Sequence, residues 1–296
     1  MKDDELVRFL QWALPRLDMR WPGYRKVRRQ VGKRIARRLD ELGLADEEPA
    51  SAPDRRTDPR SPLAAYRERL ERDPAEWRIL DGLCRITISR FYRDRRVWDD
   101  LRETVLPALA ERASRHLAGR RVLRIWSAGC ASGEEPYTIA LAWHLDVARR
   151  FPEVRLVVLA TDSDRRLLRR AHRAVYPPSS VKELPESWRQ AAFRPDDGAG
   201  GRLRLRPALR SGVHFVRHDL RDGVPIRASG PGCDLIVCRN LAFTYFAFDL
   251  QARIARDLAG ALAAGGGLLV AQTETPPAPA AGLVADHRVR GLYRRA

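Results

Sequence analysis

Five short apolar segments in the second part of the chain constrain its fold more than any other feature. They read RVLRIWSAG, VRLVVLATD, VHFVRHDL, CDLIVCRN and GLLVAQTE, and mostly helical segments separate them. Apolar strands that alternate with helices are typical of a parallel sheet with helices on both faces. We therefore predict an α/β fold with a doubly wound, Rossmann-like sheet after Gly119.

Two segments depart from this alternation. Residues 176–212 contain a short helix, PESWRQAAF, and the sequence GGRLRLRPAL, which favours small strands. We predict a small β-subdomain inserted into the main sheet at about these residues. The final segment, HRVRGLYRRA, alternates apolar and basic residues and predicts a last, antiparallel edge strand.

The beginning of the chain has apolar residues at helical spacing. Helices are predicted from about Asp4 to Leu14 and from about Tyr24 to Gly43, and residues 45–62 are rich in Pro, Ser and Asp, which favours a flexible loop. We expect a small all-α domain over residues 1–92 and the sheet domain over residues 93–296.

Charge and composition narrow the class of protein. The net charge of +17 attracts acidic partners, which include nucleic acid, an anionic membrane surface and an acidic protein. No apolar run approaches the roughly 20 residues that span a bilayer, and the first residues lack the basic and apolar regions of a signal peptide. We expect a cytoplasmic protein without membrane insertion.

The four cysteines do not have the spacing of a zinc site. They are Cys84, Cys130, Cys233 and Cys238, and four residues separate the closest pair. Zinc sites usually bring two cysteines closer together in sequence. We expect reduced thiols and no metal.

Ligands of a doubly wound sheet bind at the carboxyl ends of its strands. The first strand leads into SAGCASGEEP, where Gly129 and Gly133 let the backbone approach a ligand closely. Asp162 ends the second strand, and Asp219 and Asn240 follow later strands. These positions share one edge of the sheet and predict a ligand site.

The glycine loop does not match the phosphate-binding motifs. A nicotinamide dinucleotide requires G-x-G-x-x-G and a P-loop requires Gly-Lys-Ser/Thr, and neither is present. Glu134 would repel a phosphate, but it suits the cationic methionyl amine and sulfonium of S-adenosylmethionine, whose ribose Asp162 can bind. A glycine turn or a strand-end acid is often merely structural when it occurs alone. We expect S-adenosyl-L-methionine as cofactor and S-adenosyl-L-homocysteine as product.

These motifs resemble those of the chemotaxis receptor methyltransferases, the CheR family of protein-glutamate O-methyltransferases. IWSAGCASGEEPYTIAL, ATDSD, AVYPPSSVKELPESW and CDLIVCRN follow in the family's order, and the resemblance runs from about Tyr24 to the last strand. It implies a helical domain, then a methyltransferase domain with an inserted β-subdomain. It also implies methyl transfer to glutamate side chains of a chemoreceptor.

The resemblance further implies roles for individual residues. Arg93 matches an arginine near the transferred methyl group, and we expect it to orient the acceptor carboxylate; Tyr245 is expected to line the methyl-transfer channel. Alternatively, Arg93 forms a surface ion pair and Tyr245 is a core residue. The positions expected to contact the cofactor are Thr87, Ser89, Arg93, Gly129, Glu134, Asp162, Asp219, Leu220, Asn240 and Leu241.

Several positions depart from the family pattern. Family members usually have Asn in place of Thr87 and Thr in place of Ser89, and Asp219 replaces an amide. CRNLAFTYF is one residue longer than the family motif, so either Tyr245 or Thr244 occupies the family tyrosine position. These changes lie on the acceptor side of the site.

No histidine is expected to act in catalysis. A glutamate acceptor is already ionised at neutral pH and needs no general base. Only His218, beside Asp219, is near the site in sequence, and we interpret it as a packing or solvent-exposed residue.

The basic helix Arg25–Arg38 predicts a docking surface for an acidic helical surface of a chemoreceptor or other signalling protein, with a solvated face as the alternative. Two other functions stay open: methylation of RNA, a small molecule or a non-receptor protein, and a non-catalytic regulatory module that binds S-adenosylmethionine. The charge fits nucleic acid, but the amine-methylating pattern Asn/Asp-Pro-Pro-Tyr/Phe is absent after the fourth strand.

Overall fold

The computed structural model describes residues 2–44, 61–115, 121–198, 200–225 and 232–295. It divides the chain into two compact units. We call them the helical unit, Met1–Ile86 with Thr244–Ala247, and the sheet unit, Thr87–Phe243 with Phe248–Ala296. The loop predicted over residues 45–62 lies almost wholly outside the described residues.

The division between the units falls after Ile86, a few residues before the predicted position at 92. Phe91 and Tyr92 are fully buried in the core of the sheet unit, where they pack with Trp98. Their aromatic side chains therefore belong to the second unit.

The helical unit consists of short helices around an apolar core. Its helices are α1 (Asp3–Ala13), η1 (Leu14–Leu17), α2 (Trp21–Tyr24), α3 (Arg28–Glu41), α4 (Pro62–Arg72) and α5 (Pro74–Cys84). The helix predicted from about Tyr24 to Gly43 is α3, which begins at Arg28, because residues 25–27 form a turn after α2. Val31 and Ile35 on α3 are fully buried in this unit.

A segment from the second half of the sequence completes the helical unit. Met19 and Phe246 form an isolated antiparallel bridge, and the Arg20 amide donates a hydrogen bond to the carbonyl oxygen of Tyr245 over 2.8 Å. The rings of Tyr24 and Tyr245 meet edge to face, with 5.2 Å between their centroids. Residues 244–247 are therefore part of this packing.

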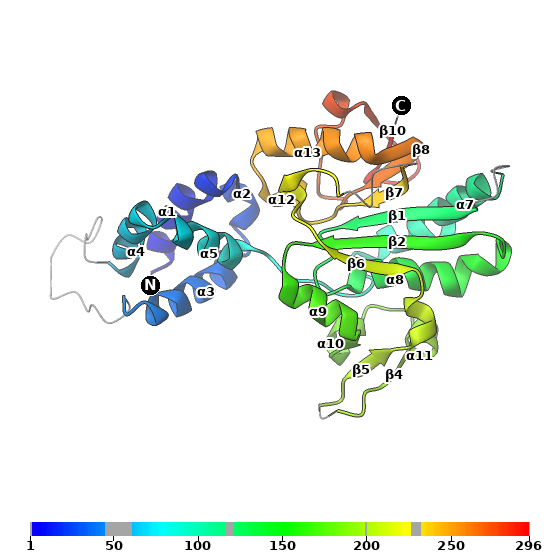
Figure 1. Cartoon of the computed structure of the whole chain (residues 1–296), viewed down its shortest axis with the longest axis horizontal. Coiled ribbons are helices and arrows are strands. Elements are labelled where there is room, and N and C mark those ends of the chain that lie inside the picture. Colours follow the sequence, from blue (N-terminus) through cyan, green and yellow to red (C-terminus); the bar gives the residue numbers. More distant parts are fainter. Residues whose placement is uncertain (1, 45–60, 116–120, 199, 226–231, 296) are drawn as a thin grey trace. The chain divides into compact units, whose positions relative to one another are not determined.

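The sheet unit is built on the predicted doubly wound sheet. Its strands lie in the order β6-β2-β1-β7-β8-β10-β9, and Figure 1 shows β6, β2, β1 and β7 side by side. The first five strands are parallel, which confirms the predicted fold class. The strand bounds are β1 (Val122–Ala128), β2 (Arg155–Asp162), β6 (Val213–Arg217), β7 (Cys233–Val237), β8 (Leu262–Leu269), β9 (Leu283–Ala285) and β10 (Leu292–Arg295).

The last predicted strand is antiparallel, but it is not the edge. β10 pairs with β8 on one side and with β9 on the other. The prediction was wrong on this point, because three residues of β9 are too few to give a recognisable sequence pattern. The described edge strand is β9.

Helices cover the sheet and fix the loops at its carboxyl edge. α7 packs on β1, α8 and α9 pack on β2 and β6, and α13 packs on β8. The helices of this unit's main fold are α6 (Arg95–Asp100), η2 (Leu101–Val105), α7 (Leu106–Ser114), α8 (Glu134–Ala142), η3 (Trp143–Val147), η4 (Ala148–Arg150), α9 (Arg165–Arg173), η6 (Leu220–Asp222), α13 (Phe248–Ala261) and η8 (Pro279–Ala281). The short helix α12 (Ala242–Tyr245) begins in this unit, and its last two residues belong to the helical unit. No described helix is long and apolar enough to cross a bilayer.

The strand order reverses at β1. The chain winds outward from β1 through β2 to β6, then returns to place β7 on the other side of β1. At such a reversal the connections leave in opposite directions and open a crevice outside the carboxyl ends of the strands. The loops after β1, β2 and β7 border this crevice.

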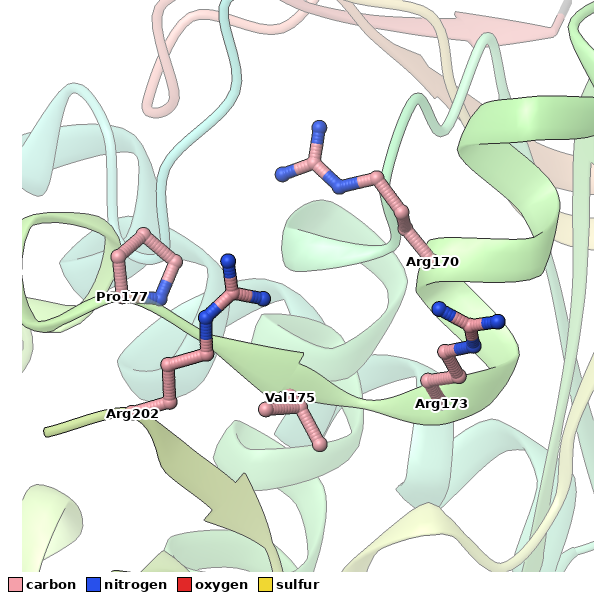
Figure 2. A pocket seen from close by; sticks show the side chains of 5 residues that line it. All are labelled: Arg170, Arg173, Val175, Pro177 and Arg202. Carbon is pink, nitrogen blue, oxygen red and sulfur yellow. The ribbon is translucent and has the colours of Figure 1, made fainter. Parts of the chain in front are cut away.

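A small antiparallel sheet is inserted between α9 and β6. Its strand order is β3-β5-β4. The inserted elements are β3 (Val175–Tyr176), α10 (Pro178–Val181), α11 (Glu186–Ala192), β4 (Phe193–Pro195), β5 (Leu203–Leu205) and η5 (Pro207–Arg210). Phe91 packs edge to face on Tyr176 and Phe193, at 4.8 and 5.3 Å between ring centroids. A cavity of about 300 Å³ lies where α9 leads into β3 (Figure 2).

A buried ion pair links helices of the helical unit. Glu76 on α5 is 1% exposed, and its carboxylate accepts hydrogen bonds from Arg38 at 2.9 and 2.8 Å and from the Tyr66 hydroxyl at 2.8 Å. The hydrogen bonds from Arg38 lower the pKa of Glu76 despite its burial. The folded unit therefore holds this carboxylate in its ionised form.

We expect Glu76→Gln to lower the free energy of unfolding by about 3 kcal/mol near neutral pH, because Arg38 loses its buried anion. Because folding lowers the pKa of Glu76, its ionised carboxylate stabilises the fold at pH values above the ordinary glutamate pKa. This stabilisation is lost as the pH falls through the folded-state pKa of Glu76. Urea-induced unfolding at several pH values measures the effect. Glu71→Gln, which removes an exposed pair with Arg67, is the control and should change stability by less than about 0.5 kcal/mol. Equal effects of the two variants would contradict this account.

Candidate functional site

The two glycines after β1 allow close packing of three segments. Gly129 and Gly133 have φ of +84° and +91°, a region that favours glycine. A Cβ on Gly129 would lie 2.4 Å from Cδ2 of Leu241, in the loop after β7. A Cβ on Gly133 would lie 2.9 Å from the Cβ of Ala171 on α9. The loops after β1 and β7 therefore lie against each other and line the crevice.

Asp162 joins the end of β2 to the glycine loop. Its Oδ2 accepts a hydrogen bond from the Ala131 amide at 2.9 Å, and its Oδ1 accepts one from the Asp164 amide at 2.8 Å. The Gly129 amide donates to the carbonyl oxygen of Thr161 at 2.8 Å. These hydrogen bonds fix the Asp162 carboxylate between the glycine loop and the start of α9.

Glu134 is a buried carboxylate at the first position of α8. It is 1% exposed, and the Ser132 hydroxyl lies 2.9 Å from both of its carboxylate oxygens. It forms no ion pair with any described residue. Burial raises the pKa of Glu134, while hydrogen bonds from Ser132 and Ser89 and the charge of Arg170 act in the opposite direction. Such a carboxylate suits a cationic ligand, which would offset its desolvation.

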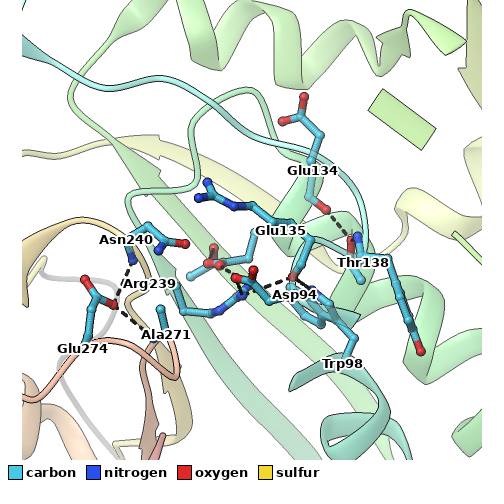
Figure 3. Close-up of polar contacts among 12 residues, drawn as sticks. Asp94, Trp98, Glu134, Glu135, Thr138, Arg239, Asn240, Ala271 and Glu274 are labelled. Atoms are coloured by element: carbon cyan, nitrogen blue, oxygen red, sulfur yellow. Dashed lines mark hydrogen bonds and ion pairs between the residues drawn. The ribbon is translucent and has the colours of Figure 1, made fainter. Parts of the chain in front are cut away.

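Glu135, the next residue, points into a buried charge network (Figure 3). Its Oε1 accepts a hydrogen bond from the Ser127 hydroxyl at 2.8 Å, and its Oε2 lies 3.6 Å from the Arg239 guanidinium. Burial raises the pKa of Glu135 to about 7, although Arg239 opposes the shift. Glu135 therefore takes part in the buried charge network as well as lying in the first turn of α8.

Arg239, directly after β7, is the cation of this network. Its side chain is 4% exposed, and its guanidinium donates to Asp94 Oδ2 at 2.6 Å and to the carbonyl oxygen of Arg93 at 3.1 Å. It also lies over the Trp98 ring, 5.0 Å from the centroid. One buried guanidinium thus links the end of β7, the start of α8 and the segment that carries Arg93.

The backbone around Arg93 is held in an unusual conformation. Tyr92 and Asp94 have φ of 57° and 63°, which is uncommon for residues other than glycine. Trp98 Nε1 donates to the Arg93 carbonyl oxygen at 2.6 Å. The Arg93 side chain donates to the carbonyl oxygen of Ile88 at 3.1 Å and forms no ion pair with any described residue. The alternative of a surface ion pair for Arg93 is not what the structure shows, because the adjacent Asp94 pairs with Arg239.

Asn240 is fixed by a buried acid. Its φ is 53°, and its amide donates to Glu274 Oε2 at 2.9 Å, an oxygen that also accepts from the Ala271 amide at 3.0 Å. Glu274 is 5% exposed. Leu241 follows and lies against Gly129.

Asp219, after β6, is already engaged by a neighbour. Its carboxylate accepts hydrogen bonds from the Arg221 amide at 3.0 Å and from the Arg221 guanidinium at 3.0 and 2.8 Å. Leu220 beside it is buried. His218 bonds through Nε2 to the carbonyl oxygen of Gly223 at 2.8 Å, which agrees with a packing role.

The remaining predicted residues lie in two places. Thr87 and Ser89 are partly buried in the extended segment that leads to Arg93. Tyr245 is buried in the helical unit, where it contacts Tyr24. Its assignment to the methyl-transfer channel therefore rests on the family resemblance.

Four charged residues and one serine that support the site were not predicted from the sequence. They are Asp94, Ser132, Glu135, Arg239 and Glu274. The arginine of CDLIVCRN, placed directly after an apolar strand, was the one signal in the sequence for a buried cation.

Comparison with known proteins identifies the family of this chain. Residues 87–281 match the family described as CheR methyltransferase, SAM binding domain. A chemotaxis protein methyltransferase of Listeria monocytogenes is 35% identical over 193 residues, which cover 65% of this chain and 67% of the relative. Chemotaxis protein methyltransferase 2 of Pseudomonas aeruginosa is 31% identical and is matched over 65% of this chain and 64% of its own length. The predicted family and cofactor are confirmed: the chain belongs to the CheR family of S-adenosylmethionine-dependent methyltransferases.

Proposed function

We propose that this methyltransferase transfers methyl groups to glutamate side chains of a chemoreceptor or receptor-like signalling protein. The observation that carries this proposal is the state of Arg93. Buried contacts hold its backbone, and its guanidinium has no acidic partner among the described residues. A planar guanidinium in this state can bind a substrate carboxylate through two hydrogen bonds.

The proposed cofactor site uses the crevice at the carboxyl edge of the sheet. S-adenosylmethionine supplies a methyl group on a cationic sulfur. Glu134 would hold the cationic methionyl end and Asp162 the ribose hydroxyls, with Thr87, Ser89 and Gly129 close to the cofactor. Asp219, Leu220, Asn240 and Leu241 are proposed to border its adenine side.

The reaction needs orientation more than proton transfer. An acceptor glutamate is ionised at neutral pH, so no general base is required. Arg93 would orient its carboxylate for in-line attack, and the Arg239 network would keep Arg93 in place. Positioning of this kind can supply several orders of magnitude in rate.

We expect Glu134→Gln to weaken the binding of S-adenosylmethionine by about tenfold or more, because a charge-assisted contact is lost. In the wild-type protein the affinity should rise as pH increases through the raised pKa of Glu134, since the carboxylate must lose its proton. The variant should lack this pH dependence. Titration calorimetry measures both effects, with the exposed Glu186→Gln as control. An unchanged affinity would remove Glu134 from the proposed site.

The acceptor is tested with isotopically labelled methyl groups and a purified receptor cytoplasmic fragment. Label on the protein that mild alkali releases supports a carboxyl ester. Arg93→Ala should lower kcat by about a hundredfold or more, with the cofactor affinity changed less than about threefold. Arg95→Ala, an exposed arginine nearby, is the control and should keep near wild-type activity.

Three results would contradict the proposed function. Alkali-stable label in RNA or in a metabolite would assign a different acceptor. Cofactor binding without transfer to any component of a lysate from the source organism would indicate a regulatory module. Wild-type kcat in Arg93→Ala would remove the role of Arg93.

We further propose that the basic helix region docks on an acidic helical surface of this receptor. Five cations of this region are exposed and form no ion pair with described residues: Arg25, Lys26, Arg29, Lys33 and Arg37. Three others are used inside the helical unit. Arg28 pairs with Asp3, Arg38 pairs with Glu76, and Arg34 donates to the backbone carbonyl of Leu83. The five exposed cations are not needed for contacts within the helical unit, which supports a partner surface; the alternative is a solvated basic face.

Reversing two of these charges should weaken docking on the receptor without affecting the binding of the cofactor. We expect Arg29→Glu with Lys33→Glu to raise KM for the receptor fragment by about tenfold or more at low salt, where surface charges are least screened. The affinity for S-adenosylmethionine should stay at the wild-type value. Arg149→Glu with Arg150→Glu, in the sheet unit, makes the same change in net charge and serves as control. If both pairs raise KM equally, only overall charge matters.

A further inference from the structure

Three arginines converge on a cavity that the proposed reaction does not use. The cavity of about 300 Å³ is lined by Arg170 and Arg173 from the last turn of α9, by Arg202 just before β5, and by Val175 and Pro177. Figure 2 shows Arg202 and Pro177 on one side, Arg170 and Arg173 on the other, and Val175 between them. Two separate parts of the chain therefore bring positive charge to one concave site.

The side chains of the three arginines of this cavity make no direct polar contact with the described part of the chain, although the charge of Arg170 also acts on the buried Glu134 carboxylate. Arg170, Arg173 and Arg202 are exposed, and none of them forms a side-chain hydrogen bond or ion pair with a described residue. Arg204, two residues further on, behaves differently, because its guanidinium pairs with Asp196 at 2.5 Å. Asp196 on this strand pair is thus used by an arginine that does not line the cavity.

The position of the helix end explains only part of this arrangement. Cations are stabilised in the last turn of a helix by its dipole, which accounts for Arg170 and Arg173. It does not account for Arg202, which belongs to the inserted sheet. Val175 and Pro177 add an apolar surface to the charged rim, as in many sites for small ligands.

The number of cations indicates the chemistry of the ligand. One carboxylate carries a single charge and two oxygens, which match one guanidinium. A phosphate ester carries nearly two charges and three terminal oxygens, which two or three guanidinium groups can share. We propose that this cavity binds a phosphorylated small molecule, with its phosphate between Arg170, Arg173 and Arg202 and its organic part against Val175 and Pro177. S-adenosylmethionine has no phosphate, so this ligand is distinct from the cofactor and independent of the proposed acceptor.

The proposal is tested by titration calorimetry with ADP and with pyrophosphate. The protein is first saturated with S-adenosylhomocysteine, so that the adenosine of ADP cannot occupy the cofactor site. At about 150 mM salt, which screens loose surface attraction, both probes should bind the wild-type protein. Arg173→Gln and Arg202→Gln should each weaken binding by about tenfold or more.

Arg169→Gln is the matched control, because this exposed arginine lies on the same helix and does not line the cavity. The affinity of the Arg169→Gln variant for both probes should stay within about twofold of the wild-type value. All variants that fold normally should bind S-adenosylhomocysteine with unchanged affinity. Equal weakening by Arg169→Gln and Arg202→Gln would overturn the proposal in favour of unspecific charge. Failure of both probes to bind the wild-type protein would also overturn it, and binding of a hexaglutamate peptide in that case would assign the cavity to an acidic peptide.

Discussion

The candidate site depends on one buried cation, the Arg239 guanidinium. A charge that is 4% exposed is costly unless it is paired and hydrogen bonded, and Asp94 and Glu135 supply its anions. The same group donates to the carbonyl oxygen of Arg93. Three loops that are distant in sequence therefore meet at one point. Because Asp94 is used in this network, it does not pair with the side chain of Arg93, as the proposed role of Arg93 requires.

Unusual backbone conformations cluster at the same edge of the sheet. Tyr92, Asp94, Ala131 and Asn240 all have positive φ, and each lies in a loop that borders the crevice or carries Arg93. Such conformations cost about 1–3 kcal/mol each and persist where surrounding contacts fix them. Hydrogen bonds to Asp162 and Glu274 hold the loops of Ala131 and Asn240. Contacts within the protein therefore fix the conformation of these two loops.

Much of this arrangement follows from local sequence patterns. Apolar runs predicted the parallel strands, and the topology of a doubly wound sheet brought Glu134, Asp162 and Asn240 to one edge. Pairings between distant segments could not be predicted from the sequence, because they depend on tertiary contacts. They include the partners of Arg239, the edge strand beyond β10 and the grouping of Tyr245 with the helical unit. Local patterns suggested that glycines of the loop serve a ligand; they did not show that Gly129 also has a positive φ and lies against the side chain of Leu241.

The central claim is that Glu134 and Asp162 hold the cofactor at the carboxyl edge of the sheet. A crystal structure of the protein with S-adenosylhomocysteine tests it most directly. The account predicts the ribose hydroxyls within hydrogen-bond distance of Asp162, the methionyl amine beside Glu134, and the sulfur facing Arg93. A cofactor bound with neither Asp162 nor Glu134 in contact would contradict the account.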